Sequence, residues 1–313
     1  MKDRENLFHG SIDLKYSDGY TIPYRFNDEH IAAISTNDHY QQRTKCGASV
    51  TLEFVTNAKN ISFDYKFFLR TGVESTFEVF VDGFLTHMIK DCDLSDEGNL
   101  NFEFEEGEKR IEIYLPNFSE VGIKNLTSDL DLIPIPEKDE KILFIGDSIT
   151  QGGGSKRSGM TFVNVVKRAL DCEVLNWGIG SYIFDKEIIA KSKFVPQKIV
   201  IAMGTNNRWY EFEKNEQEID AFFEKLNALY PNVPILTVIP PWSGEPNEKL
   251  AIRAKEIKGI IENTVIKYPK IKTINAYNII PHFPEYYMED LLHPKSLGMA
   301  VYGYNLAKKI KEL

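Results

Sequence analysis

The chain has 313 residues, enough for two domains, and its 42% hydrophobic and 27% charged residues are typical of a globular protein. A formal net charge of −9 argues against nucleic acid or an anionic membrane surface as a partner. The first ten residues lack an apolar signal core, and no stretch approaches membrane-spanning length. The three cysteines (Cys46, Cys92 and Cys172) are widely spaced and form no C-x-x-C motif, which indicates reduced thiols. We therefore expect a cytoplasmic protein.

Residues 1–135 are patterned as short strands, without a helical period between them. Several segments alternate apolar and polar residues, and Asp82-Gly83, just before Phe84, is a strong signal for a two-residue hairpin. The expected strands are 51–55, 61–65, 76–81, 101–104 and 110–115. Many short strands at this spacing predict an all-β domain, a β-sandwich of the jelly-roll kind.

The pattern changes after residues 132–140, where Pro134 and Pro136 favour an extended, semi-rigid linker followed by charged residues. Strands then alternate with helical stretches, which predicts a parallel sheet flanked by helices. The expected strands are 142–145, 173–176, 198–203, 235–239 and 273–276, and the expected helices are 161–170, 185–192, 217–229, 248–268 and 297–313. We therefore expect two domains, residues 1–135 and 136–313.

The stretch that organises the second domain is KILFIGDSITQGGG, residues 141–154. A continuous apolar run ends at Gly146-Asp147, so Ser148 follows the carboxyl end of a buried parallel strand. Ligands bind at that edge of open α/β sheets, which makes Ser148 a candidate nucleophile. The alternative is that Ser148 is only a helix N-cap. The phosphate-loop and dinucleotide-binding motifs are both absent here.

Three later segments carry polar groups to the same edge. The second strand leads into a segment whose glycines let the backbone approach a ligand closely. The N–H groups of Gly180 and Ser181 can point at that ligand. The third is followed by Asn206, which offers a side-chain amide. Near the end of the chain Asp290 precedes His293 by three residues, so both side chains can lie on the same side of one turn.

These residue types together can catalyse acyl transfer. His293 can remove the proton of the Ser148 hydroxyl, and Asp290 can fix the tautomer of His293 and stabilise the imidazolium that forms. The negative oxygen of the tetrahedral intermediate could then meet the Ser148 N–H, a backbone N–H of Gly180 or Ser181, and the Asn206 amide.

In these residues the C-terminal part, about residues 141–313, resembles the SGNH (GDSL-type) hydrolase family. Four blocks stand in the family's order: Gly146-Asp147-Ser148-Ile149, Asn176 to Ser181, Gly204-Thr205-Asn206-Asn207, and Asp290-x-x-His293. The resemblance implies a three-layer, flavodoxin-like α/β hydrolase domain in which Ser148, His293 and Asp290 are catalytic. The chain departs from the family where Ser181 replaces a glycine, which leaves Gly180 or Ser181 open as the donor, and where Asn207 replaces an acid.

The whole architecture, a sandwich followed by this domain, resembles carbohydrate esterase family two and related two-domain acyl hydrolases. Local similarity lies around Phe8-His9-Gly10 and Tyr114-Leu115-Pro116. Weaker candidates for substrate contacts are Asp147, Trp209 and Trp242. The two tryptophans are weak because aromatic residues near strand ends more often serve packing. The remaining histidines are scattered without ligand spacing, so we predict no metal site, and no cofactor is expected.

Three functions follow from this reading. The first is a serine esterase that removes short acyl groups, most simply acetyl, from a carbohydrate or another small hydroxylic substrate. The second is an acyltransferase that uses the same site, and the third is a glycan-binding protein with a catalytically poor hydrolase-like domain.

Because the linker is stiff and the connections at the carboxyl edge of the sheet are short, we also expect the sandwich to form one wall of the substrate cleft. The sequence leaves the oligomeric state open.

Overall fold

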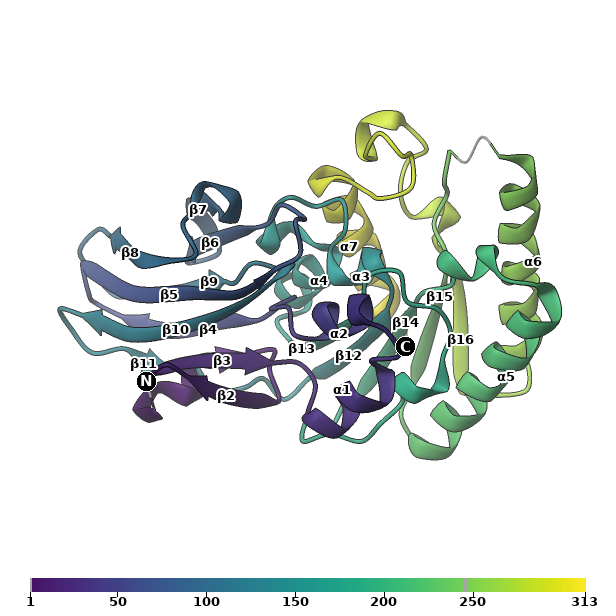
Figure 1. Cartoon of the computed structure of the whole chain (residues 1–313), viewed down its shortest axis with the longest axis horizontal. Coiled ribbons are helices and arrows are strands. Elements are labelled where there is room, and N and C mark those ends of the chain that lie inside the picture. The colour runs from purple at the N-terminus through teal and green to yellow at the C-terminus, as the bar shows by residue number, and fades with distance from the viewer. Residues whose placement is uncertain (1, 245–246) are drawn as a thin grey trace.

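The computed structural model describes residues 2–244 and 247–313. Two antiparallel sheets form one end of the molecule, and a parallel sheet covered by helices forms the other (Figure 1). This arrangement confirms the expected fold class, a three-layer α/β domain with a parallel sheet, preceded by a β-rich region. None of the helices in the described ranges is both long enough and apolar enough to cross a membrane.

The two antiparallel sheets enclose a core of apolar side chains such as Phe54, Phe63 and Phe77. The first sheet runs, in spatial order, β1 (Phe8–His9), β4 (Thr51–Thr56), β9 (Lys109–Tyr114), β6 (Thr76–Val81) and β7 (Phe84–Lys90), with β11 (Ile133–Pro134) paired to β4. The second runs β2 (Asp13–Ser17), β3 (Tyr20–Tyr24), β10 (Ser119–Ser128), β5 (Asn60–Arg70) and β8 (Glu97–Glu103).

The Asp82-Gly83 turn joins β6 and β7 as an antiparallel pair, which confirms the predicted hairpin. Both turn residues have a positive φ, 49° at Asp82 and 83° at Gly83. Two consecutive left-handed residues match the right-handed twist of the strands, and this is the reason that Asp-Gly marks such turns.

Two short helices of the N-terminal region, α1 (Asp28–Ile34) and α2 (Asp38–Thr44), were not expected from the sequence. The Asn27 side chain caps α1 and the Asn37 side chain caps α2 by accepting backbone hydrogen bonds. Seven residues are too few to show a helical period. Both helices lie between the antiparallel sheets and the parallel sheet (Figure 1), so they bring N-terminal side chains toward the second domain.

The parallel sheet has the strand order β13-β12-β14-β15-β16, which is the flavodoxin-like order. Its strands are β12 (Lys141–Gly146), β13 (Glu173–Gly178), β14 (Lys198–Ala202), β15 (Ile235–Ile239) and β16 (Ile271–Asn275). Alternate residues of β12 belong to different apolar clusters, Leu143 and Ile145 on one face and Ile142 and Phe144 on the other. Coverage of both faces explains the continuous apolar run in the sequence.

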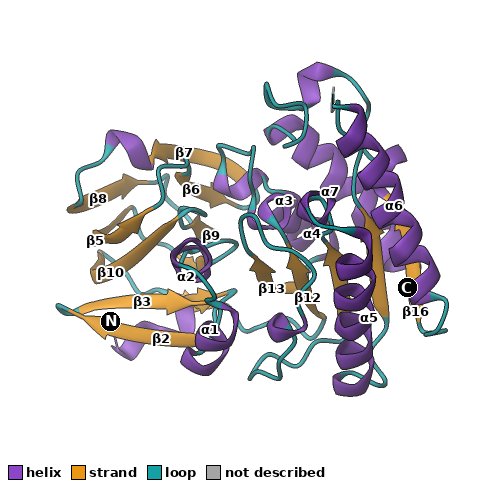
Figure 2. Ribbon diagram, turned by 45° about the vertical axis from the view of Figure 1, so that its right-hand side comes forward, coloured by secondary structure: helices purple, strands orange, loops and turns teal. Residues whose placement is uncertain are grey.

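Helices cover the sheet on both sides and complete three layers (Figure 2). The helices are α3 (Ser148–Gln151), α4 (Phe162–Leu170), α5 (Phe212–Leu229), α6 (Glu248–Val265) and α7 (Ser296–Lys311). α4 and α7 contribute to one apolar cluster, and α5 and α6 to the other. Short 3-10 helices are η1 (Lys2–Leu7), η2 (Asp91–Asp93), η3 (Ser158–Met160), η4 (Lys186–Ile188), η5 (Asn206–Trp209), η6 (Ala276–Asn278) and η7 (Pro284–Tyr286).

The helix expected at 185–192 is wrong, because only the short turn η4 forms there. The Ile188 carbonyl accepts a hydrogen bond from His30 Nε2 at 2.8 Å, and the Ala190 carbonyl accepts one from the Tyr230 hydroxyl at 2.5 Å. Ile189 is extended, with φ −85° and ψ 108°, which ends the turn after Ile188, and side chains from elsewhere in the fold bond the carbonyls of this segment.

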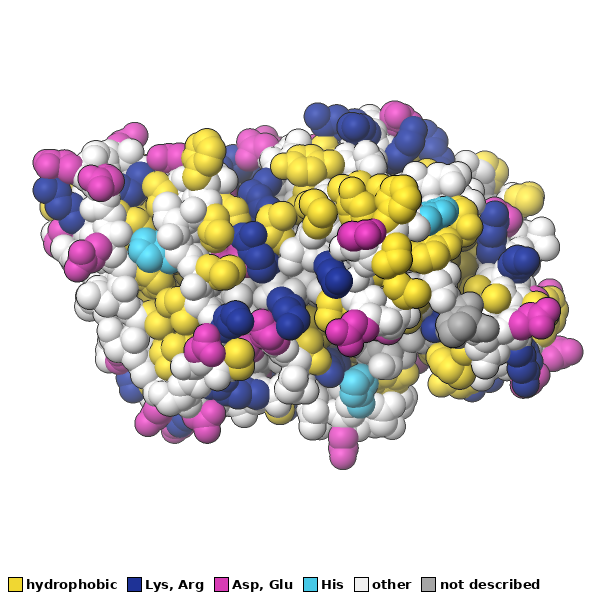
Figure 3. All heavy atoms as spheres, turned by 90° about the horizontal axis from the view of Figure 1, so that it is seen from above, with side chains coloured by type: hydrophobic (Ala, Val, Ile, Leu, Met, Phe, Trp, Pro, Cys, Tyr) yellow, Lys and Arg dark blue, Asp and Glu magenta, His cyan; other side chains and the backbone are white. Residues whose placement is uncertain are grey.

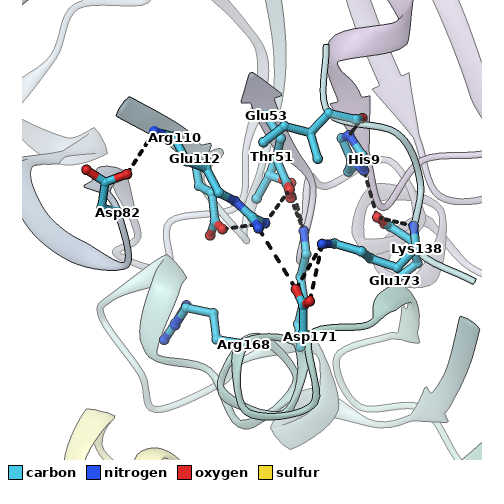
Figure 4. Close-up of polar contacts among 12 residues, drawn as sticks. His9, Thr51, Glu53, Asp82, Arg110, Glu112, Lys138, Arg168, Asp171 and Glu173 are labelled. Atoms are coloured by element: carbon cyan, nitrogen blue, oxygen red, sulfur yellow. Dashed lines mark hydrogen bonds and ion pairs between the residues drawn. The ribbon is translucent and has the colours of Figure 1, made fainter. Parts of the chain in front are cut away.

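A buried polar interface joins the first antiparallel sheet to α4 and β13 (Figure 4). Lys167 of α4 forms an ion pair with Glu53 of β4, and His9 Nδ1 lies 2.9 Å from Glu173 Oε1 at the start of β13. Arg110 reaches the same Glu53 carboxylate at 3.2 Å. The two regions are therefore packed together, although the domain boundary at 135/136 stays a prediction.

Candidate active site

Ser148 is the first residue of α3, directly behind the carboxyl end of β12. The cap of this helix is Asp147, whose Oδ1 accepts the Ile149 N–H at 3.0 Å, so the alternative reading of Ser148 as the cap is wrong. Gly146 has no room for a side chain, since a Cβ atom there would lie 2.3 Å from the Ala202 carbonyl oxygen. The tight turn leaves Ser148 half-buried at the carboxyl edge of the sheet.

A chain of hydrogen bonds leads from Ser148 to Asp290. Ser148 Oγ lies 2.8 Å from His293 Nε2, and His293 Nδ1 lies 2.6 Å from Asp290 Oδ2. The other carboxylate oxygen of Asp290 accepts the backbone N–H groups of Leu292 at 2.9 Å and His293 at 3.0 Å. With Nδ1–H donated to the carboxylate, Nε2 can accept the serine proton.

The carboxyl group of Asp290 is held in its charged form. Its partial burial alone would raise the pKa, but the hydrogen bonds from the His293 side chain and from the backbone N–H groups of His293 and Leu292 outweigh that effect. They hold the pKa of Asp290 below its usual value. Asp290 is therefore an anion wherever His293 would have to act as a base.

The glycine run after Ser148 makes room for His293. A Cβ atom on Gly153 would lie 3.1 Å from His293 Cδ2, and one on Gly154 would lie 2.8 Å from His293 Cβ. Gly154 also has φ +92°, a conformation that favours glycine. These glycines allow the imidazole to lie close to the Ser148 helix.

Free backbone donors near Ser148 favour Ser181 over Gly180 in the oxyanion hole. The Gly180 N–H is already donated to Gln151 Oε1 at 2.7 Å. Ser181 has φ +64°, in the left-handed region that favours glycine, the residue that the family usually has at this position. Within residues 2–244 and 247–313, the N–H groups of Ser181 and Ser148 donate no hydrogen bond.

Asn206 belongs to η5, at the end of β14, and its Nδ2 donates to the Tyr182 carbonyl at 3.0 Å. This bond uses one of the two amide hydrogens and fixes the side chain, while the second hydrogen remains for a ligand. The neighbouring Asn207 is buried, and its side chain bonds Phe184 N at 3.1 Å and Asn215 Oδ1 at 2.9 Å. Asn207 thus serves the packing of the loop.

Asp147 is almost fully buried, with 1% of its surface exposed. Burial raises the pKa of its carboxyl to about 6, and the hydrogen bond from the Ile149 N–H and the nearby His293 oppose this only in part. Its burial and its capping bond favour a structural role for Asp147 over the substrate contact that the sequence suggests.

The two tryptophans lie in different surroundings. Trp209 is 64% exposed, three residues after Asn206, and the Arg208 guanidinium lies 5.6 Å from the centre of its ring. Trp242 is half-buried and stacks on His282, with ring centroids 5.2 Å apart, and meets Tyr287 edge-on at 5.0 Å. Trp209 can therefore meet a substrate, whereas Trp242 contributes mainly to loop packing.

Apolar side chains gather on the face above the carboxyl ends of the strands (Figure 3). The segments that follow β14 and β16 carry several large exposed apolar residues, among them Trp209, Phe212, Phe283 and Leu297. In the described ranges no group of three or more His, Cys, Asp or Glu side chains is arranged to hold a metal ion.

The N-terminal helix α2 adds residues to this edge that the sequence did not reveal. The Tyr40 hydroxyl lies 3.3 Å from the Ser181 carbonyl oxygen, and its ring meets Tyr182 edge-on at 4.9 Å. Gln151, three residues after Ser148, holds Gly180. Position on the Ser148 turn could have marked Gln151, but nothing in the sequence marks Tyr40.

The GDSL-like lipase/acylhydrolase family model matches residues 144–301, just over half of the 313-residue chain. The chain belongs to this family. A search of the curated proteins finds no match to this acylhydrolase.

Solved structures show that this acylhydrolase shares its two-part fold with other proteins. A salicylyl-acyltransferase from a tetracycline biosynthetic pathway is 16% identical, with a TM-score of 0.78 over 97% of this chain and 94% of that one. A family two carbohydrate esterase from Clostridium thermocellum, in complex with cellohexaose, is 17% identical, with a TM-score of 0.69 over 93% and 98%. An acetyl xylan esterase from Butyrivibrio proteoclasticus is 15% identical, with a TM-score of 0.62 over 85% and 90%.

Proposed function

We propose that this acylhydrolase is a serine esterase that removes short acyl groups, most simply acetyl, from a carbohydrate or another small hydroxylic substrate. The observation that carries the proposal is the unbroken hydrogen-bonded chain of Ser148, His293 and Asp290, with distances of 2.8 and 2.6 Å. It joins a nucleophile to a base and the base to an orienting carboxylate, at the sheet edge where α/β proteins bind ligands.

The first half of the reaction forms an acyl-enzyme. Ser148 Oγ attacks the ester carbonyl carbon while its proton passes to His293 Nε2, and the Asp290 carboxylate stabilises the imidazolium. The N–H groups of Ser148, Ser181 and Asn206 stabilise the negative carbonyl oxygen. When the intermediate collapses, the C–O bond to the alcohol breaks, and His293 returns the proton to the leaving alkoxide.

The second half releases the acyl group. A water molecule gives a proton to His293 Nε2 as its oxygen attacks the acyl carbon. The bond to Ser148 Oγ then breaks, and the serine oxygen takes the proton back from His293. The products are a carboxylic acid and the free enzyme.

The fold neighbours and the surface support the choice of substrate. Two of the similar structures are carbohydrate esterases, one holding cellohexaose and one named as an acetyl xylan esterase. The exposed ring of Trp209 beside Asn206 offers the flat apolar surface on which a sugar ring can pack. Exposed apolar side chains on this face also suit an uncharged substrate better than an ionic one.

A second candidate function is acyl transfer to another alcohol in place of water. The salicylyl-acyltransferase, similar over 97% of this chain, supports it. The acyl-enzyme would be the same, and only the acceptor of the second half would differ. The third possibility, a glycan-binding protein with a poor catalytic domain, has the complete chain of Ser148, His293 and Asp290 against it.

Turnover of p-nitrophenyl acetate, followed by acetate release from a panel of acetylated sugars, tests the proposal. We expect p-nitrophenol release and a preference for one class of acetylated sugar. Formation of a new ester on addition of acceptor alcohols, with little free acetate, would identify an acyltransferase. Absence of turnover with every ester would contradict both enzymatic functions.

A further inference from the structure

Arg25 is a buried cation of the N-terminal region for which the reaction above has no role. It follows β3, is 0% exposed, and forms no ion pair within the described residues. Its guanidinium bonds four backbone carbonyls: Cys46 O at 2.7 Å, Arg43 O at 2.8 Å, Gly178 O at 3.0 Å, and Asn176 O. Two of these acceptors lie in the N-terminal region and two in the parallel sheet.

Burying a guanidinium without a carboxylate is unfavourable. Burial lowers the pKa of Arg25 to about 10, so the group is still protonated at neutral pH. An apolar side chain could fill the same space between the two regions without desolvating a charge. What distinguishes an arginine at this position is therefore its hydrogen bonds to the four carbonyls.

The two carbonyls in the parallel sheet are at the end of an edge strand. Among the residues that the structure describes, β13 pairs with β12 alone, and its outer edge has no neighbouring strand. Asn176 and Gly178 are alternate residues, and their carbonyls point to the same side. Arg25 Nη1 bonds both, and the Arg25 carbonyl accepts the Trp177 indole N–H at 2.8 Å. Arg25 thus supplies the hydrogen bonds that a neighbouring strand would give to these two carbonyls.

The backbone held by Arg25 leads directly to the oxyanion donor. Past Gly178, the Ile179 N–H bonds Gly146 O at 3.1 Å, and the Gly180 N–H bonds Gln151. The next N–H is that of Ser181. Through Arg43 O, the same guanidinium also holds α2, whose Tyr40 hydroxyl lies against the Ser181 carbonyl. Ser181 therefore lies between the end of β13 and α2, and Arg25 bonds both of these elements.

We propose that Arg25 is a positioning residue that holds the end of β13 so that the Ser181 N–H points at the developing oxyanion. The N-terminal region would then complete the catalytic apparatus as well as border it. This inference rests on the proposed esterase function.

Steady-state kinetics of the full chain with Arg25→Lys and Arg25→Met, on p-nitrophenyl acetate, test the inference. Lysine keeps the charge but cannot span four carbonyls, and methionine keeps only the volume. We expect kcat to fall about 10- to 100-fold in both, with KM within about twofold, because an oxyanion donor acts mainly in the transition state. The inhibition constant of a small alkylboronic acid, whose tetrahedral adduct uses the same donors, should rise by a similar factor.

A matched control loosens the same interface far from the donor. His9→Leu combined with Glu173→Leu replaces the buried pair at the other end of β13 by apolar residues and leaves no orphan charge. Its kcat should stay within about twofold of the wild type, whatever its melting temperature. An equal loss of kcat in this control would show that Arg25 only docks the two regions, which would overturn the inference.

Unchanged kcat in Arg25→Lys, with the wild type active, would also overturn it while leaving the proposed function intact. If Arg25→Met does not fold, Arg25→Lys decides, with near-ultraviolet circular dichroism as the check on its fold. A wild-type chain without esterase turnover would overturn the proposed function and this inference together.

Discussion

Three N–H groups are the candidate oxyanion donors of this site. They are the backbone N–H groups of Ser148 and Ser181 and the second amide hydrogen of Asn206. Each comes from a different strand end, after β12, β13 and β14. The Asn206 amide is a side-chain group, so a substitution can remove it while the two backbone donors stay in place.

Asn206→Ala should lower kcat by about two to three powers of ten, the usual loss for one oxyanion donor. KM should change little, because the donor acts on charge that develops in the transition state. Thermal unfolding is the control, since the variant also loses the bond to the Tyr182 carbonyl. A large rise in KM with kcat unchanged would instead make Asn206 a substrate-binding residue.

Asp147→Asn should become more stable, relative to the wild type, as pH rises. Folding raises the pKa of the Asp147 carboxyl from 3.8 to about 6. The protonated carboxyl therefore stabilises the fold fully below about pH 4, and this stabilisation is lost as the pH rises through 6. A shift of about two pKa units corresponds to about 3 kcal/mol at pH 7.5, which an uncharged Asn avoids while its Oδ1 can still cap α3.

Urea unfolding of both proteins at pH 4 and at pH 7.5 measures this difference. The stability of Asp147→Asn minus that of the wild type should increase by a few kcal/mol between the two pH values. A difference that does not depend on pH would show that Asp147 has an ordinary pKa in the folded protein.

At the scale of elements, α2 borders the site through Tyr40, whose ring lies against Tyr182 and whose hydroxyl lies against the Ser181 carbonyl. Tyr40→Ala should widen the cleft beside Ser181. We expect kcat/KM for large acetylated sugars to fall by about tenfold relative to that for p-nitrophenyl acetate, since one buried aromatic contact is worth about 1–2 kcal/mol. Tyr40→Phe is the matched control, because it keeps the ring. Equal changes for both substrates would argue against a wall at α2.

Elements with a strong local signal could be predicted from the sequence. β12 is a continuous apolar run that ends at a glycine, and β6 and β7 flank an Asp-Gly turn. The signal fails where distant contacts decide the conformation. The segment after Ile188 is extended and bonds the distant side chains of His30 and Tyr230, and α1 and α2 are too short to show a period.

The same distinction holds for the candidate site. Ser148 follows a strand end, and Asp290 and His293 share one turn, so residue type and spacing could predict the three side chains that hydrogen bonds join. The role of Asn206 stays a prediction. Arg25 gave no signal, because its partners are backbone carbonyls up to 153 positions away in the chain. Every residue has a backbone carbonyl, so the residue types in a sequence do not show which carbonyls a side chain will bond. Ser181 was one of two alternatives until its φ of +64° and the bonded Gly180 N–H favoured it.

At the scale of the whole molecule, the N-terminal region covers groups of the α/β domain that need partners. Lys167 and Glu173 are buried against Glu53 and His9. The Trp177 side chain is fully buried and bonds the Arg25 carbonyl. Without the N-terminal region, an apolar surface and two charges would be uncovered.

A fragment that begins at about Lys138 should therefore be poorly soluble. In whatever part of it folds, Ser148 should still react with phosphonates, while selectivity among acetylated substrates is lost. Expression with a solubility partner, followed by the same panel of acetylated sugars, checks this. A stable fragment with the full-length substrate profile would mean that the N-terminal region is an independent module.

The most direct test of the account is to identify the residue that carries the acyl group. Wild-type protein is mixed with p-nitrophenyl acetate, quenched in acid during the burst and digested for mass spectrometry, with a fluorophosphonate-treated sample alongside. We expect both adducts on the peptide that contains Ser148, and we expect Ser148→Ala to keep its melting temperature and lose turnover. An adduct on another residue, or a Ser148→Ala protein with undiminished turnover, would contradict the account.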